Sequence, residues 1–412
     1  MRIALISEHA SPLAAIGGAD SGGQNVHVAQ LARALGERGH HVTVFTRRDD
    51  PGSPDRVRIG PGVTVEHVRA GPVTMLPKDA LLPHMAQFGD HLAQRWLVEP
   101  PDVAHAHFWM SGLAAQRAAR RIGIPVLQTF HALGVVKRRH QGASDPSPRS
   151  RLRLEKQLAR DAALVVATCT DEVTELTALG VPASQVAVVP CGVDLECFTP
   201  RGPRAARGGR HRILSLGRLV ERKGVETTVR AMAAVPDAEL VIAGGGDAIA
   251  DAEQARLTMV AAASGVQDRV RLIGQIPRDE VPALLRSADV VVSVPWYEPF
   301  GMVPLEAMAC GVPVIASAVG GHLDTVVDGR TGALVPPRDP AALAQRLREL
   351  LADPARLAAI GSAAATRARV HYGWSRIATE TEALYRQVLA GEEVKAACLP
   401  GSSPATAAGG QP

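Results

Sequence analysis

Two short apolar runs near residue 300 constrain the fold of this chain more than any other feature. They span residues 289–294 and 312–316, and both are predicted to be buried strands. Between them there is room for a loop and about two turns of helix, with Pro304 suited to the helix start and Gly311 to its end. Strands joined in this way lie parallel, and parallel sheets bind ligands beyond the carboxyl ends of their strands. A binding site is therefore predicted in the loop after residue 294.

Two carboxylates flank this predicted site. Glu298 lies in the loop, and Glu306 lies in the first turn of the helix. Backbone N–H groups at a helix N-terminus attract phosphate. Here these groups belong to Phe300, Gly301, Met302 and Val303. Carboxylates accept hydrogen bonds from sugar hydroxyls, so the stretch offers what a nucleotide-sugar requires. The alternative is that Glu306 caps its own helix and Glu298 faces solvent.

The length and composition of the chain exclude several classes of protein. With 412 residues, the chain is too long for a domain with one hydrophobic core and long enough for two domains. An anionic small substrate accounts for the mild net charge of +4, so no nucleic-acid partner is expected. Five irregularly spaced cysteines indicate reduced thiols and a cytoplasmic protein. No apolar run approaches the ~20 residues of a membrane span, so the activity should not require a membrane. The sequence does not indicate an oligomeric state.

The first half of the chain alternates strands with helices. Strands are predicted at residues 3–7, 41–46, 63–68, 103–107, 126–129 and 163–167. Helices are predicted at 24–38 and from about Leu81, Gly112, Arg151 and Asp171. The alternation predicts a doubly wound α/β domain over residues 1–198. Gly22 and Gly23, before the first helix, form either a tight turn or a loop whose N–H groups approach an anion.

Histidines follow two of the predicted strands. His105 and His107 end the strand at 103–107, and no third ligand is nearby in the sequence, so no metal site is expected there. His131 comes just after the strand that ends at Thr129, a position that faces the ligand cleft of a parallel sheet. The basic run at residues 137–140 is expected to be a solvated loop.

The second half repeats the α/β pattern after a linker at residues 199–212. A second domain is predicted over residues 213–372, and its first strand is followed by Arg218 and Lys223, whose charges suit a diphosphate. The alternative is that both charges are merely exposed. A last helix at 376–390 precedes a tail, 391–412, whose composition predicts disorder. The chain is thus predicted to form two Rossmann-like domains that face a cleft.

The stretch from Glu298 to Glu306, E-P-F-G-M-V-P-L-E, resembles the signature of the retaining glycosyltransferases of family 4, which have the GT-B fold. The resemblance covers residues 1–389 and includes motifs in both predicted domains. Within the family, residues 17–26 are similar to both the D-inositol-3-phosphate glycosyltransferases and the sucrose-phosphate synthases. The last helix is implied to cross back and pack on the first domain.

This resemblance implies a hexosyltransferase whose donor is a nucleotide-diphospho sugar. Arg218 and Lys223 are implied to neutralise the leaving diphosphate, helped by the N–H groups of Gly301 and Met302. Glu306 is implied to bind the ribose hydroxyls. No Asp-x-Asp sequence occurs in the chain, so neither a metal ion nor a cofactor beyond the co-substrate is expected to be required.

The resemblance places the sugar between the two domains, with His131 and Glu298 bound to it. The loop of Gly22 and Gly23 is implied to lie beside the diphosphate and part of the acceptor. The acceptor hydroxyl is implied to attack the sugar on the same face from which the diphosphate leaves. The leaving phosphate is implied to accept the proton of that hydroxyl.

The acceptor side is implied to lie in the first domain. There the family brings together Asn25, Lys78, Arg151 and Arg153, and three cations near one cleft favour a phosphorylated acceptor. The alternative is that the two arginines open a solvated helix.

Two residues depart from the inositol-phosphate pattern. Phe108 stands where that pattern has a tyrosine hydroxyl, and Ala132 where it has a threonine hydroxyl. Both changes remove a hydrogen-bond donor, which argues against inositol phosphate itself. An unphosphorylated glycan, lipid or natural-product acceptor stays open. So does a nucleotide-sugar epimerase of the same fold, which would isomerise the donor without any acceptor.

Overall fold

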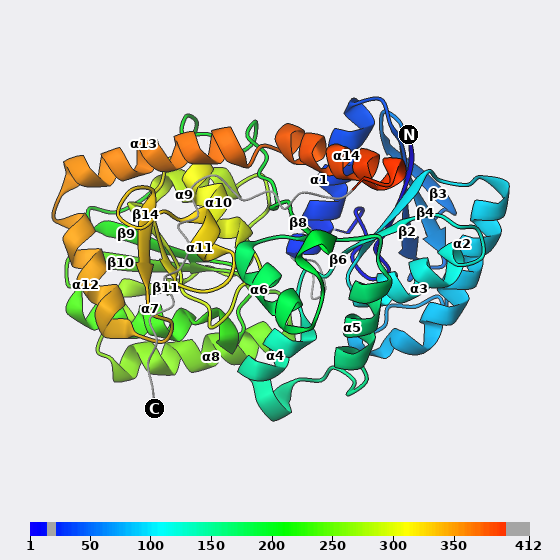
Figure 1. Ribbon diagram of the computed structural model, residues 1–412. Coiled ribbons are helices and arrows are strands. Elements are labelled where there is room, and N and C mark those ends of the chain that lie inside the picture. Colours follow the sequence, from blue (N-terminus) through cyan, green and yellow to red (C-terminus); the bar gives the residue numbers. More distant parts are fainter. Residues whose placement is uncertain (15–21, 393–412) are drawn as a thin grey trace, which may run out of the picture.

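The computed structural model describes residues 1–14 and 22–392, which form two α/β domains (Figure 1). The first contains an eight-stranded sheet in the order β3-β4-β2-β1-β5-β6-β7-β8. Its strands are β1 (Arg2–Ile6), β2 (His41–Arg47), β3 (Arg56–Gly60), β4 (Val63–Val68), β5 (Val103–His107), β6 (Val126–Thr129), β7 (Leu164–Ala167) and β8 (Val186–Val188). Its helices are α1 (Gly23–Glu37), α2 (Met85–Val98), α3 (Trp109–Ala119), α4 (Gly134–Gln141), α5 (Arg151–Asp161) and α6 (Thr170–Ala178).

The second domain contains a six-stranded sheet in the order β11-β10-β9-β12-β13-β14. Its strands are β9 (His211–Leu216), β10 (Ala238–Ala243), β11 (Val270–Leu272), β12 (Val290–Ser293), β13 (Val314–Ser317) and β14 (Gly332–Val335). Its helices are α7 (Val225–Ala231), α8 (Ala248–Ala263), α9 (Val281–Ser287), α10 (Met302–Ala309), α11 (His322–Thr325), α12 (Pro340–Leu351) and α13 (Pro354–His371). The last helix, α14 (Trp374–Ala390), reaches back over α1 of the first domain (Figure 1).

The described strand pairs are parallel except β3–β4, and both sheets carry helices on both faces. Burial on both faces explains why central strands such as β1 and β12 are mostly apolar. The strand order reverses between β1 and β5 in one sheet and between β9 and β12 in the other. Such switch points leave a crevice beyond the strand ends, where ligands bind. The loops after these four strands therefore surround the expected site.

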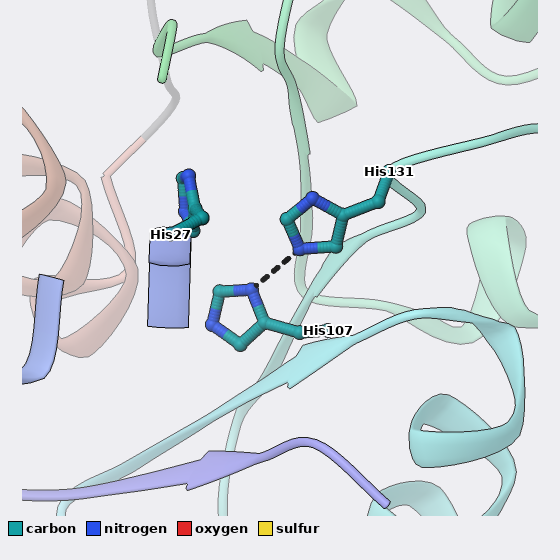
Figure 2. Close-up of side chains that lie close together, drawn as sticks. All are labelled: His27, His107 and His131. Carbon is teal, nitrogen blue, oxygen red and sulfur yellow. Dashed lines mark hydrogen bonds between the residues drawn. The ribbon is translucent and has the colours of Figure 1, made fainter. Parts of the chain in front are cut away.

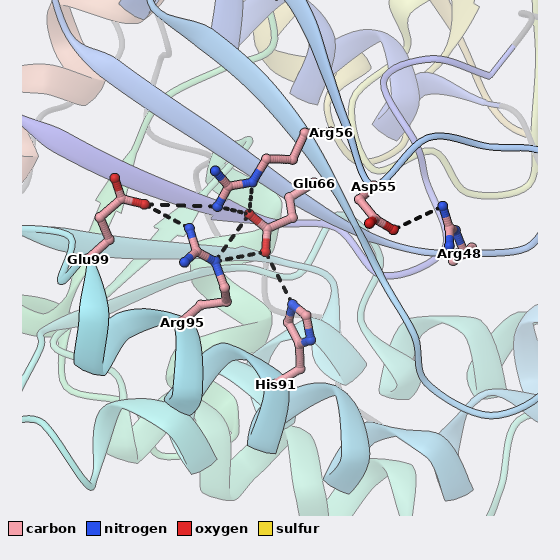
Figure 3. A network of polar contacts seen from close by, with 7 residues as sticks. All are labelled: Arg48, Asp55, Arg56, Glu66, His91, Arg95 and Glu99. Carbon is pink, nitrogen blue, oxygen red and sulfur yellow. Dashed lines mark hydrogen bonds and ion pairs between the residues drawn. The ribbon is translucent and has the colours of Figure 1, made fainter.

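The edge of the first sheet is held to α2 by charges (Figure 3). Glu66 on β4 is buried and accepts hydrogen bonds from Arg56 of β3 and from Arg95 of α2, at 2.9 and 3.0 Å. His91 of α2 lies 3.2 Å from the same carboxylate. A buried carboxylate requires such partners, because leaving it unpaired is costly.

Most strands and helices lie within a few residues of their predicted ranges, but several elements were not predicted. These are β3, β14, α4, α8, α9 and α11. The expected solvated loop at residues 137–140 was wrong, because this run lies in α4, where Arg139 pairs with Glu175 and Lys137 with Asp145. Helix α10 begins at Met302 instead of Pro304, since Gly301 ends the loop with a φ of 90°. Residues 17–21 and nearly all of the tail lie outside the described residues.

Candidate active site

The loops after β9 and β12 bring a lysine and a glutamate into contact. Lys223 Nζ forms an ion pair with Glu298 Oε2, and the Glu298 side chain is 13% exposed. Burial alone would raise the pKa of Glu298, but Lys223, His322 and Arg222 outweigh it and lower that pKa to about 2. Glu298 is therefore an ionised hydrogen-bond acceptor held in place, and it does not face solvent as the alternative interpretation had it.

Glu306 has a cationic partner that the sequence did not reveal. Arg278, just beyond β11, donates from Nη2 to Glu306 Oε1 and stacks over Phe198 with 4.6 Å to the ring centroid. Burial raises the pKa of Glu306, and Arg278 opposes that shift. No side chain caps α10 at Gly301, so the carboxylate of Glu306 faces Arg278 and not the start of its own helix. The signal for Arg278 was its place after β11, another parallel strand of the same sheet.

Two helix N-termini meet across the cleft at glycines. A Cβ on Gly23, at the start of α1, would lie 3.1 Å from Met302 Sδ at the start of α10. Gly301 has a left-handed backbone, and a Cβ there would meet the His322 ring at 2.6 Å. A Cβ on Gly22 would meet no atom of the described residues within 4 Å. Two positive helix ends that share one gap suit an anion such as a diphosphate.

Three histidines converge on the first-domain side of the cleft (Figure 2). His131 Nε2 lies 3.0 Å from His107 Nδ1, and His27 of α1 brings a third ring nitrogen within 4.8 Å of the others. Burial lowers the pKa of His27 to about 4 and holds those of His107 and His131 well below 6.5. The sequence showed no third ligand close to His107, because His27 is distant along the chain and is brought in by α1.

The predicted acceptor cations do not all lie together. Arg151 is buried and donates to Glu155 at 2.7 Å and to the Ala132 carbonyl at 2.6 Å. Arg153 is exposed on the same helix, and residues two apart on a helix point to different sides. Asn25 is buried, and its side-chain Oδ1 accepts a hydrogen bond of 3.0 Å from the backbone N–H of Gly22 at the start of α1.

A different lysine completes the cationic cluster. Lys137 of α4 and Arg151 both donate to Ser147 Oγ, at 2.9 and 3.1 Å. The ring of Phe108 lies 5.3 Å from Lys78 Nζ and 5.2 Å from Arg151 Cζ. Burial lowers the pKa of Lys78, and so do Lys137, Arg151 and Arg218, while Asp79 offsets part of the shift. The charge of Arg218, from the second domain, thus acts on Lys78 in the first.

The sequence of the chain matches two family profiles. Residues 21–197 match the one described as Glycosyltransferase Family 4, and residues 201–367 match Glycosyl transferases group 1. A D-inositol 3-phosphate glycosyltransferase of Nocardiopsis dassonvillei is 37% identical over 404 residues, 93% of this chain and 94% of that protein. One of Paenarthrobacter aurescens is also 37% identical, over 94% of this chain and 98% of that protein. The chain belongs to the family 4 glycosyltransferases.

Solved structures confirm that this glycosyltransferase has the GT-B fold. A sucrose-phosphate synthase from Thermosynechococcus elongatus superposes with a TM-score of 0.88 at 36% identity, over 95% of this chain and 100% of that one. An Anabaena HepE complex with UDP and glucose gives a TM-score of 0.74 at 20% identity, over 94% and 99%, which bears on the fold alone. Among residues 1–14 and 22–392, no helix is both long and apolar enough to cross a membrane.

The two domains of the glycosyltransferase also touch beside the cleft. Asp324 of α11 accepts from the backbone N and the hydroxyl of Thr170 of α6, both at 2.6 Å. Gln141 donates to the Tyr297 hydroxyl at 2.6 Å. A cavity of about 220 Å³ lies between these contacts, lined among others by Leu133, His140, Glu172, Tyr297, Glu298 and Leu323. The cleft is thus closed along one side by direct hydrogen bonds between the domains.

Proposed function

We propose that this glycosyltransferase moves a hexosyl group from a nucleotide-diphospho sugar to a small phosphorylated acceptor, with retention at the anomeric carbon. The observation that carries this proposal is the surroundings of Lys78. Its side chain is half-buried and is repelled by the charges of Lys137, Arg151 and Arg218. A bound dianion would reverse this repulsion, so the cluster favours an acceptor phosphate. The names of the relatives agree, since both D-inositol 3-phosphate and sucrose-phosphate refer to phosphorylated sugars or polyols.

The donor half rests on the charges of the loop after β9, Arg218 and Lys223. Lys223 keeps three donor hydrogens, so it can contact a phosphate while it remains paired with Glu298. Arg218 acts electrostatically on both Lys223 and Lys78, and its charge is proposed to act on donor and acceptor alike. Cations fixed where negative charge develops lower the barrier to departure of a diphosphate.

The sugar is proposed to lie between Glu298 and His131. Glu298, being ionised, accepts hydrogen bonds from hydroxyls, and His131, being neutral, can donate one bond or accept one. The leaving phosphate takes the proton of the attacking hydroxyl as the new glycosidic bond forms on the same face. Glu306 is proposed to bind the ribose hydroxyls, with Arg278 as its partner.

The proposal is tested with a panel of donors and acceptors. UDP, GDP and ADP are screened by thermal shift, because the nucleotide that binds the native state stabilises it by mass action. Sugars of that nucleotide are then incubated with polyols and sugars, each with and without a phosphate. Turnover confined to phosphorylated acceptors is expected. Equal use of both kinds would indicate a glycan, lipid or natural-product acceptor. Isomerisation of the donor without an acceptor would indicate an epimerase.

A further inference from the structure

We propose that His27, His107 and His131 together bind one divalent transition-metal ion such as Zn²⁺, and that this ion inhibits sugar transfer. The site is supplied by three parts of the first domain: helix α1, the end of β5 and the residues after β6 (Figure 2). The inhibition rests on the proposed role of His131 at the sugar, whereas the binding of the ion does not.

The geometry is close to that of a zinc site. Zinc–nitrogen distances of about 2.0–2.1 Å in a tetrahedron place neighbouring ligand atoms roughly 3.3 Å apart. His107 Nδ1 and His131 Nε2 are already 3.0 Å apart, and one ring nitrogen from each of the three residues lies within 4.8 Å of the others. The remaining contraction is small enough for rotations of the His27 and His131 side chains.

The chemistry of the three rings also suits a metal ion. Metal binding requires an unprotonated nitrogen from each imidazole, and the 3.0 Å hydrogen bond between His107 Nδ1 and His131 Nε2 already needs one of these two nitrogens to be unprotonated. His107 Nε2 is buried and has no hydrogen-bond partner among residues 1–14 and 22–392, so it can carry the proton of the neutral ring while Nδ1 binds the ion. Imidazole ligands select zinc, copper, nickel or iron over magnesium, which prefers oxygen.

The surroundings hold the third ligand in place. His27 Nδ1 lies 3.3 Å from Cys191 Sγ, and its ring packs edge-on against Trp374, with centroids 5.4 Å apart. Such outer contacts fix the orientation of a ligating ring. With three protein ligands the fourth position stays open for water or a hydroxyl. Because His131 Nε2 would then be bound to the ion, the ring would rotate away from the position proposed to meet the sugar and would keep only Nδ1 for a hydrogen bond.

The binding is tested on the full chain after dialysis against a chelator. Calorimetric titration with Zn²⁺ is expected to show one site per chain, and Mg²⁺ no heat. Co²⁺ is expected to give the visible absorption of a tetrahedral imidazole site. His27→Phe keeps a ring against Trp374 and is expected to weaken Zn²⁺ binding at least ~100-fold. His9→Gln, which changes a histidine beside Phe108, is the matched control and should bind as the wild type does.

Two results would overturn the site. One is the absence of the tetrahedral Co²⁺ spectrum in the wild type, which does not depend on whether any variant folds. The other is Zn²⁺ binding by a folded His27→Phe protein that equals the wild type. Turnover of the wild type is expected to fall at one equivalent of Zn²⁺ and to return with chelator. Full turnover with the site occupied would overturn the inhibition alone, and a failure of the proposed transfer reaction would leave the binding result intact.

Discussion

Lys223 and Glu298 form an ion pair that joins the loop after β9 to the loop after β12. The pair couples a cation proposed to meet the diphosphate with a carboxylate proposed to meet the sugar. The two side chains therefore hold each other in position in the loops that follow two adjacent strands, β9 and β12, of the second sheet. Changing one of them should affect both halves of the donor site.

Lys223→Ala is expected to lower kcat at least tenfold, because loss of a charge at the leaving group costs at least ~1.4 kcal/mol. The Lys223 side chain is only 26% exposed and is paired, so the alternative of a merely exposed charge was wrong for this residue. Removing it leaves Glu298 buried without its closest partner, which should lower the free energy of unfolding by about 1–3 kcal/mol. Lys223→Arg, which keeps the charge, is the control. Near-normal kcat in folded Lys223→Ala protein would contradict the assignment.

Lys78→Ala is expected to raise KM for the phosphorylated acceptor roughly 10–100-fold, the effect of losing one charge-assisted hydrogen bond. KM for the donor should change little. Arg151→Ala tests the same pocket less cleanly, because Arg151 also supports the fold through Glu155 and Ala132. Arg153→Ala is the matched control, since this exposed arginine should leave both KM values unchanged. Equal effects of Lys78→Ala and Arg153→Ala would argue against the phosphate pocket.

The stability of the protein should fall as the pH drops below about 6.5. Burial lowers the pKa of His27 to about 4 and that of His105 to about 3, and holds those of His107 and His131 well below the ordinary 6.5. The unfolded chain therefore takes up protons that the folded chain refuses, and each costs about 1.4 kcal/mol per pH unit. Glu172 acts in the opposite direction. Burial raises its pKa to about 7, so the folded chain takes up one proton there before the unfolded chain does, and this offsets part of the loss of stability.

Melting temperatures between pH 7.5 and pH 4 measure this loss. His27→Phe should flatten the pH dependence by one proton, because a phenyl ring does not titrate. A melting temperature that stays constant over this range would contradict the burial of four neutral imidazoles.

Thr170→Val is expected to open the cleft in the absence of ligand. It removes a hydroxyl that donates to Asp324 across the domains at 2.6 Å while it keeps the shape of the side chain. Small-angle scattering should show a larger radius of gyration than in the wild type, and a larger decrease on saturation with nucleotide. Thr174→Val, on the same helix but with its hydroxyl bonded to a carbonyl of α6, is the control. Equal radii for all three proteins would contradict the role of this contact.

The donor loops could be predicted from the sequence because parallel strands carry their ligands at the carboxyl ends. Arg218, Lys223 and Glu298 all follow predicted strands, and strand order at the switch point brings their loops together. The sequence also predicts that Arg153 and Arg151 point to different sides of α5, since residues two positions apart do not share a helix face.

The partners of these residues could not be predicted, because each comes from a distant part of the chain. Arg278 meets Glu306, and Lys137 meets Arg151 through Ser147, only once the helices have packed. His27 gave only the weak signal of lying in the first helix after the glycine loop. Its approach to His107 depends on which face of α1 turns toward the sheet. The residues near His27 in the sequence do not show which distant side chains it will meet.

The most direct test of the proposed reaction is the anomeric configuration of its product. The nucleotide-sugar that the panel selects is incubated with a phosphorylated polyol or sugar, and the product is followed by proton NMR while nucleoside diphosphate is counted. One nucleoside diphosphate should appear for each acceptor consumed, and the new glycosidic bond should keep the configuration of the donor. Inversion of that configuration, or release of nucleotide without any acceptor consumed, would contradict a retaining transfer between these two sites.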